Sequence, residues 1–64
     1  MNEIKNLNIT MNEMIKNAEY FNYPYDIGEW DGGKCLNVYQ SMFYQTHYYF
    51  DENGKCVDVE VLEI

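Results

Sequence analysis

The feature that most constrains this chain is the stretch from Lys34 to Phe50, seventeen residues without glycine or proline between two glycine-bearing turns. Its even-numbered positions are more apolar than its odd-numbered positions, which is typical of a strand with one buried face. The pattern predicts one long, bent central strand with a hairpin at each end. A break near Gln40 and Ser41 would replace it with two strands.

Turn signals lie on both sides of this stretch. Asp31-Gly32-Gly33 precedes it and Asn53-Gly54 follows it, and glycine readily adopts the positive φ of tight hairpin turns. Residues 25–30 and 55–63 lie beyond the turns and are predicted to pair with the central strand. The sequence therefore predicts an antiparallel meander of three strands, or of four if the long strand breaks.

The second hairpin also predicts which side chains are buried. A two-residue loop places Phe50 opposite Val57. Tyr48 then lies opposite Val59, and a four-residue loop leaves the faces unchanged. The core face is expected to hold Val57, Val59 and Val61. The other face is expected to hold Cys56, Asp58, Glu60 and Leu62, across from Tyr49 and His47.

A helix is predicted before the sheet, at about 10–21. Thr10 and Glu13 have the spacing of a capping box, in which each side chain accepts a hydrogen bond from the other residue's amide. Ile9 and Met14 have the spacing of a hydrophobic staple. Asn22 can close the helix in the left-handed conformation. One apolar face follows the helical spacing: Met11, Met14, Ile15, Ala18 and Phe21.

The predicted fold is therefore α+β, a single small domain over 1–64. One amphipathic helix packs on one face of the antiparallel sheet, and the other face is left to solvent or to a partner. Residues 1–8 are polar and asparagine-rich, and we expect them to be irregular.

The charge balance restricts the partners. Eleven acidic residues and four lysines, with no arginine, give a formal net charge of −7. Arginine is the residue best suited to forked phosphate contacts, and DNA binding needs several cations. We therefore expect no direct binding to nucleic acid and none to an anionic membrane surface. A basic protein would be attracted by the same field, although such a charge would also serve simply to keep a small domain soluble.

The two cysteines are expected to remain free thiols. On one long strand, Cys35 lies near its start and Cys56 pairs near its end, which is too far apart for a disulfide. Free thiols fit a reducing cytosol. The sequence has no basic leader and no apolar run that would span a membrane, so we expect no signal peptide and a cytoplasmic location.

No combination of side chains predicts catalysis. His47 is the only histidine, and a neighbouring Asp58 or Glu60 would raise its pKa and orient it. A nucleophilic pair of His47 with Cys35 or Cys56 is the alternative. No glycine-rich oxyanion or phosphate loop accompanies either arrangement. We therefore predict no catalytic residue.

Metal-binding patterns are not evident either. Cys35, Cys56 and His47 lack the C-x-x-C and H-x-x-x-H spacings of zinc sites, although a site shared between subunits stays open. Residues 51–53 carry oxygen ligands without the twelve-residue EF-hand pattern. The sequence predicts no metal and no cofactor.

The remaining candidates combine acidic and aromatic side chains. Tyrosine and tryptophan are common anchors of protein interfaces, and carboxylates spaced along strands can take the place of phosphates before a basic groove. An uncovered aromatic sheet face would also favour aggregation if it had no partner. The predicted partner-binding residues are Glu29, Trp30, Asp31, Tyr39, Tyr49, Asp51, Glu52, Asp58 and Glu60.

In its length of 64 residues, its lack of arginine, its acidic sheet from Asp51 to Glu63 and its lack of a catalytic constellation, the chain resembles a class of small acidic inhibitors. These are encoded by phages and other mobile elements, and anti-CRISPR proteins are among them. The resemblance implies a non-enzymatic inhibitor in the host bacterial cytosol. It would act as an acidic nucleic-acid mimic that occupies a basic groove of a bacterial nuclease or nucleoprotein, and a homodimer stays open.

Three other functions remain open. The first is a self-assembling binder of a small molecule such as a nucleotide, for which tyrosine stacking is suitable and four lysines are poor phosphate ligands. The second is a small enzyme that uses His47. The third is a small structural phage protein.

Overall fold

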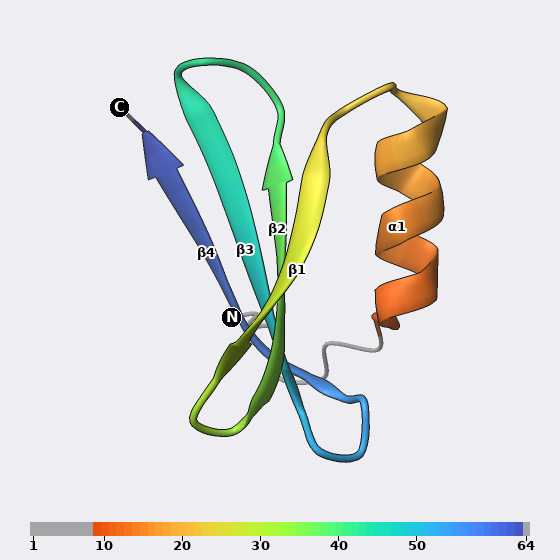
Figure 1. The fold of residues 1–64 in the computed structure, drawn as a ribbon, viewed down its shortest axis with the longest axis vertical. Coiled ribbons are helices and arrows are strands. Elements are labelled where there is room, and N and C mark those ends of the chain that lie inside the picture. Colours follow the sequence, from red (N-terminus) through yellow and green to blue (C-terminus); the bar gives the residue numbers. More distant parts are fainter. Residues whose placement is uncertain (1–8, 64) are drawn as a thin grey trace, which may run out of the picture.

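The computed structural model describes residues 9–63, which form one helix followed by four strands (Figure 1). The helix packs against one face of an antiparallel sheet, so the fold is α+β, as predicted. The expectation of an irregular segment at 1–8 lies outside the described residues. The elements are α1 Met11–Tyr20, β1 Tyr25–Trp30, β2 Gly33–Tyr39, β3 Tyr44–Asp51 and β4 Cys56–Glu63.

The predicted capping box is present at the start of α1. The Glu13 amide donates a hydrogen bond to the Thr10 hydroxyl at 3.2 Å, and the Thr10 amide donates one to the Glu13 carboxylate, also at 3.2 Å. At the other end, Asn22 adopts the left-handed conformation with φ 61°. The Tyr23 amide then donates to the Ala18 carbonyl at 2.8 Å. Local sequence signals therefore define both ends of this helix.

The sheet has the order β1-β2-β3-β4, and every neighbouring pair is antiparallel. The prediction of one strand from Lys34 to Phe50 is wrong, because the chain reverses between β2 and β3. The alternative of a break near Gln40 and Ser41 is confirmed. A seventeen-residue strand would extend about 56 Å at about 3.3 Å per residue. The molecule measures 28 Å along its longest axis, so such a strand would leave half its length without a partner.

The reversal between β2 and β3 uses a serine rather than a glycine. The Phe43 amide donates a hydrogen bond to the Ser41 hydroxyl at 3.0 Å, and the Ser41 amide donates to the Tyr44 carbonyl at 3.4 Å. Serine side chains stabilise turns by such local bonds, but more weakly than Asn or Asp. Met42 and Phe43 project from this turn and are 78% and 57% exposed. Their apolar character hides the turn in the sequence.

Apolar side chains from the helix and the sheet form the core. Leu36, Val38 and Phe50 are buried and pack with Ala18 of α1. They occupy even-numbered positions of β2 and β3, as the period-two pattern predicted. Partly buried residues surround this core: Ile9, Met11, Met14, Ile15, Tyr23, Tyr25, Tyr48 and Val59.

The turn between β3 and β4 is longer than two residues. The Asp51 carboxylate accepts hydrogen bonds from the amides of Asn53 and Lys55, both at 2.9 Å. The Gly54 amide donates to the Asp51 carbonyl at 2.9 Å, and Gly54 has a φ of +85°. The hairpin is therefore located correctly by its Asn-Gly signal, and residues 52–55 lie between the two strands, as in the four-residue alternative.

This turn changes the predicted pairing at the start of β4. Phe50 pairs with Cys56, and a bulge between Tyr49 and Phe50 absorbs Val57 as an extra residue. Tyr48 still pairs with Val59, as predicted. The expectation that Cys56 faces away from the core is wrong, since this side chain is 1% exposed within the core.

Two of the valines expected in the core are largely exposed. Val57 is 45% exposed because it is the extra residue of the bulge, and Val61 is 62% exposed. Val61 belongs to the last residues of β4, and this end of the strand lies on the opposite side of the molecule from α1 (Figure 1). The ten-residue helix does not reach this part of the sheet.

The capping box gives a test of the fold. We expect Thr10→Ala to lower the free energy of unfolding by about 1 kcal/mol, because it removes the acceptor for the Glu13 amide. Thr10→Ser keeps that acceptor, so its urea midpoint should stay close to that of the unchanged protein. Equal midpoints for the alanine and serine variants would contradict a stabilising role for the cap.

Candidate functional site

The candidate site lies on the face of the sheet opposite α1. Four side chains form a row across all four strands there, because Asp26 pairs with Asn37, Asn37 with His47, and His47 with Glu60. Asn37 follows the core residue Leu36 on β2, and His47 is an odd number of residues from the core residue Phe50 on β3, so both side chains point away from the core. Asp26 and Glu60 pair with them and share their face. We call this surface the open face.

Hydrogen bonds join one half of this row. The Asn37 amide group donates to Asp26 at 2.7 Å, and the Tyr39 hydroxyl donates to the other Asp26 oxygen at 2.9 Å. Both bonds favour the charged carboxylate and lower the pKa of Asp26. The same bond raises the pKa of Tyr39, since ionising the phenol would remove the donor.

The orientation of Asn37 determines the state of His47. The Asn37 nitrogen donates to Asp26, so its oxygen faces Nδ1 of His47 at 2.5 Å. The imidazole therefore carries its proton on Nδ1 and donates it. Nε2 of His47 is buried and has no hydrogen-bond partner among residues 9–63. Glu60 lies opposite His47, as expected, but its carboxylate bonds to Tyr49 instead.

The arrangement around Cys35 does not activate a nucleophile. The Cys35 thiol donates to the Asn37 oxygen at 3.2 Å rather than to a base. Burial raises the pKa of this thiol, and the nearby carboxylates of Asp26 and Glu60 raise it further. Cys56 lies in the core on the other face, where burial also raises its pKa. Both thiols are free, and neither is paired with His47 in the described part of the chain.

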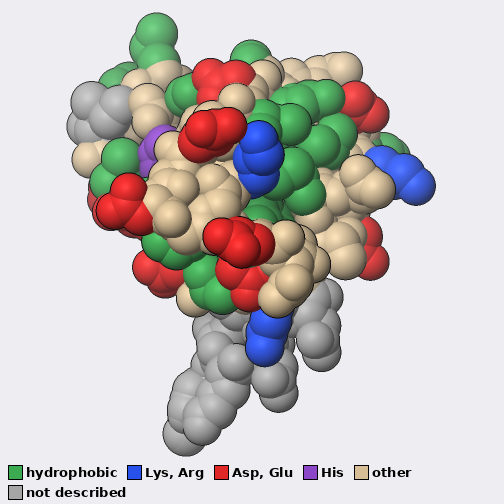
Figure 2. Space-filling view, turned by 60° about the horizontal axis from the view of Figure 1, so that its bottom comes forward, with side chains coloured by type: hydrophobic (Ala, Val, Ile, Leu, Met, Phe, Trp, Pro, Cys, Tyr) green, Lys and Arg blue, Asp and Glu red, His purple; other side chains and the backbone are tan. Residues whose placement is uncertain are grey.

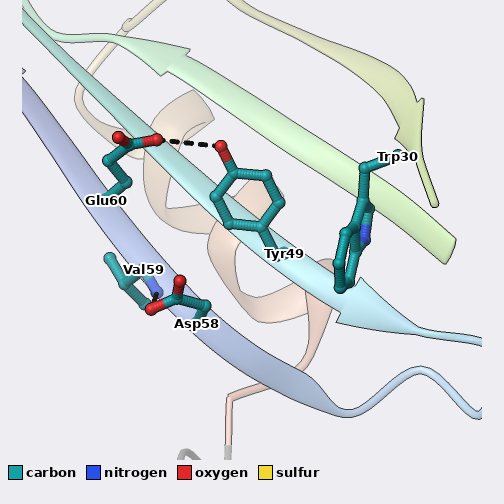
Figure 3. A pocket seen from close by; sticks show the side chains of 5 residues that line it. All are labelled: Trp30, Tyr49, Asp58, Val59 and Glu60. Carbon is teal, nitrogen blue, oxygen red and sulfur yellow. Dashed lines mark hydrogen bonds between the residues drawn. The ribbon is translucent and has the colours of Figure 1, made fainter. Parts of the chain in front are cut away.

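A hollow opens on the open face beside β4. It has a volume of about 380 Å³ and is lined by Trp30, Tyr49, Asp58, Val59 and Glu60. Figure 3 shows the two aromatic rings next to each other, with the two carboxylate side chains projecting from β4 on the far side of Tyr49 from Trp30. Segments far apart in the sequence thus form one small concave surface.

Trp30 is held in place by the strand next to its own hairpin. Its indole nitrogen donates a hydrogen bond to the Phe50 carbonyl at 3.0 Å, and its ring meets Tyr49 edge to face with 5.4 Å between centroids. A Cβ on Gly32 would overlap the indole ring, and one on Gly33 would overlap the Phe50 carbonyl. Glycines at these two positions therefore allow the indole to lie across the end of β2.

The carboxylates of the hollow are held differently from the rings. One Glu60 oxygen accepts the Tyr49 hydroxyl at 2.9 Å, which raises the pKa of Tyr49. One Asp58 oxygen accepts the Val59 amide at 2.9 Å. Within residues 9–63, no cationic side chain pairs with either carboxylate. The ion pair found within these residues lies outside the hollow and joins Lys34 to Glu29 at 3.2 Å.

The structure brings four of the nine predicted partner-binding residues together in this hollow, namely Trp30, Tyr49, Asp58 and Glu60. The other five lie elsewhere. Tyr39 lies near the other end of the open face, bonded to Asp26, and Glu29 is held by Lys34.

Asp31, Asp51 and Glu52 lie at or next to the hairpin turns, and the Asp51 carboxylate is occupied by turn amides. Figure 2 shows acidic side chains spread among hydrophobic ones over the face that it presents.

Sequence reasoning missed Asp26 and Asn37. Their role depends on the register of β1, β2 and β3, and the assumption of one long strand removed the β2–β3 pairing from consideration. Cys35 and Asn37 are two residues apart on one strand, and Asp26 and Gly28 are two residues apart on the next, so each pair shares a face of the sheet. This spacing would have placed Asp26 and Asn37 on the same face once the break at Ser41 was recognised.

Comparison with known proteins adds no functional assignment. No protein-family model, curated protein sequence or solved structure matches this chain. In residues 9–63, no group of three or more His, Cys, Asp or Glu side chains is placed to hold a metal ion. The described helix is too short and too polar to cross a membrane.

The hydrogen bonds to Asp26 predict a pH dependence of stability. Because folding lowers the pKa of Asp26, its contribution is present above the unfolded-state value of about 3.9 and is lost as the pH falls toward the lower folded-state value. We expect the urea midpoint of Asp26→Asn to lie below that of the unchanged protein at pH 7. The difference should shrink as the pH falls below about 4. Asp31→Asn, in the turn between β1 and β2, is the control. The same dependence of the urea midpoint on pH in both variants would contradict a stabilising role for the Asp26 carboxylate.

The thiols give a second prediction. Burial raises the pKa of both Cys35 and Cys56, so little thiolate forms at pH 7.5. We expect both to react with iodoacetamide at least about tenfold more slowly in the folded protein than in guanidinium chloride. Rapid alkylation of Cys35 in the folded protein would instead indicate an activated nucleophile.

Proposed function

We propose that this protein is a non-enzymatic inhibitor of the anti-CRISPR type, which binds a basic nucleic-acid-binding surface of a bacterial defence nuclease and acts as an acidic nucleic-acid mimic. The observation that carries the proposal is the hollow on the open face. It combines two aromatic rings with two carboxylates that have no cationic partner among residues 9–63, in a chain of net charge −7 without arginine. Such a surface suits a basic protein partner.

The position of the carboxylates supports this proposal. Asp58 and Glu60 are two residues apart on β4, so their side chains project from the same side at a spacing of about 7 Å. β4 is an edge strand, and a partner can approach it without displacing another part of the described sheet. Trp30 and Tyr49 supply rigid apolar surface beside the charges, as interface anchors do.

The polar row on the open face argues against the enzyme hypothesis. His47 donates its Nδ1 proton to the Asn37 side-chain oxygen, and its Nε2, the nitrogen that would have to accept a proton from a substrate, is buried. Cys35 is a buried thiol of raised pKa. The hydrogen bonds among Asp26, Asn37 and His47 instead tie three strands together.

A self-assembling protein is the second candidate, and a specific observation favours it. Exposed apolar side chains gather where the β2–β3 turn meets the last residues of β4. They are Met42, Phe43, Tyr44, Val61 and Leu62. A homodimer could bury them, although two copies would each bring a net charge of −7.

The inhibitor proposal is tested by an affinity pull-down of the tagged protein from a nuclease-treated bacterial lysate rich in defence systems. We expect one basic nucleoprotein or nuclease to be retained, identified by mass spectrometry and released by added DNA. Its affinity should fall at least about tenfold between 50 and 300 mM NaCl, since the contacts are charged and exposed.

The double variant Asp58→Asn with Glu60→Gln should lose this retention, whereas Glu63→Gln should keep it. Glu63 is on the same strand, at the far end from the β3–β4 hairpin, and alternates to the opposite face from Glu60. Retention that is insensitive to salt and unaffected by the double variant would overturn the proposal. A homodimer in light scattering with no retained protein would favour self-assembly.

A further inference from the structure

We infer that the hollow lined by Trp30, Tyr49, Asp58 and Glu60 is a socket for a single arginine side chain of the partner protein. The inference rests on the proposed function and names the chemistry of its principal contact. Three features of the hollow carry it: the fixed aromatic wall, the free carboxylate oxygens and the small volume.

The aromatic wall is rigid before any partner arrives. The bond from the Trp30 indole to the Phe50 carbonyl fixes one ring, and the bond from the Tyr49 hydroxyl to Glu60 fixes the other. The indole N–H is already used, so Trp30 offers only its π surface to a ligand. Rings that are fixed in this way attract a cation without a further loss of side-chain entropy.

The carboxylates are fixed through one oxygen each. Glu60 accepts the Tyr49 hydroxyl through Oε1, and Asp58 accepts the Val59 amide through Oδ1. The second oxygen of each has no hydrogen-bond partner in the part of the chain that the structure describes. A planar guanidinium has five N–H donors, so it can bond to both carboxylates while its face lies on an aromatic ring. A lysine ammonium is a compact point charge without a flat face, so it cannot bond to both carboxylates and also stack on an aromatic ring.

The volume of the hollow is sufficient for the end of a long side chain. A hollow of about 380 Å³ is at the lower end of the range for ligand pockets, about 300–1,000 Å³. It accommodates the end of one long side chain. Its apolar lining is the aromatic wall of Trp30 and Tyr49, which gives the methylene groups of an arginine an apolar contact.

The arginine must come from another kind of protein. This chain contains no arginine, so a second copy cannot fill the socket with one. The strongly basic side chains of a second copy are all lysines. The choice between arginine and lysine therefore also separates a foreign partner from self-association.

The experiment uses the full-length protein and three synthetic peptides of the form acetyl-Ser-Thr-X-Thr-Ser-amide, in which X is arginine, lysine or the neutral isostere citrulline. Trp30 is the only tryptophan, so its fluorescence and its indole N–H signal in a ¹⁵N-resolved NMR spectrum report directly on the hollow. Titrations at 20 mM NaCl give the dissociation constants. The Asp58→Asn and Glu60→Gln variants are compared with Glu63→Gln, and circular dichroism checks that each is folded.

We expect the arginine peptide to bind at least about tenfold more tightly than the citrulline peptide, and more tightly than the lysine peptide, with the indole signal shifting on binding. Asp58→Asn and Glu60→Gln should each weaken binding about threefold or more, whereas Glu63→Gln should change it less than about twofold. The side-chain oxygen in the Glu60→Gln variant can still accept the Tyr49 hydroxyl, so the ring stays in place.

Three results would overturn the inference. They are equal binding of arginine and citrulline peptides, tighter binding of the lysine peptide, and equal effects of the three variants. The failure of the inference is distinguishable from the failure of the proposed function. If the pull-down still yields a basic protein that is retained through Asp58 and Glu60, the inhibitor proposal survives without an arginine socket.

Discussion

The packing of α1 on the sheet through Ala18, Leu36 and Phe50 is the constraint on which the rest of the structure depends. A chain of 64 residues buries only about 60% of its unfolded surface, so one such layer of contacts is all that it can form. Among residues 9–63, the ten-residue helix α1 covers one face of the sheet, and no other described element covers the opposite face. The burial of Leu36 therefore decides, by alternation, that Cys35 and Asn37 belong to the open face.

The open face shows how a small sheet is stabilised without a second apolar layer. Hydrogen bonds from Asn37 to Asp26 and from His47 to Asn37 connect β1, β2 and β3, and the bond from Tyr49 to Glu60 connects β3 to β4. These bonds give partners to polar groups that lose contact with water where neighbouring side chains cover them. The tyrosines act as structural donors here, so an aromatic sheet surface does not by itself indicate a binding surface.

The hollow differs from the rest of this face because each of its two carboxylates accepts a hydrogen bond through only one of its oxygens within residues 9–63. Two glycines let Trp30 lie across the end of β2, and this brings an aromatic wall beside β4. Asp58 and Glu60 then line the hollow beside this wall, and neither is paired with a cationic side chain in residues 9–63. In this acidic chain, the hollow is therefore where unpaired carboxylates lie next to a concave aromatic surface.

Sequence alone determined the elements whose signals are local: the capped helix, the left-handed Asn22, the two glycine-bearing hairpins, and the apolar face of Leu36, Val38 and Phe50. It also placed Tyr49, Asp58 and Glu60 on one face, since alternation extends across a pair of strands. Only the tertiary structure decided the β2–β3 reversal, because Ser41, Met42 and Phe43 carry weak turn signals within an apolar run. It also decided the bulge that buries Cys56 and the approach of Trp30 to Tyr49, because both depend on packing between segments that no local pattern encodes.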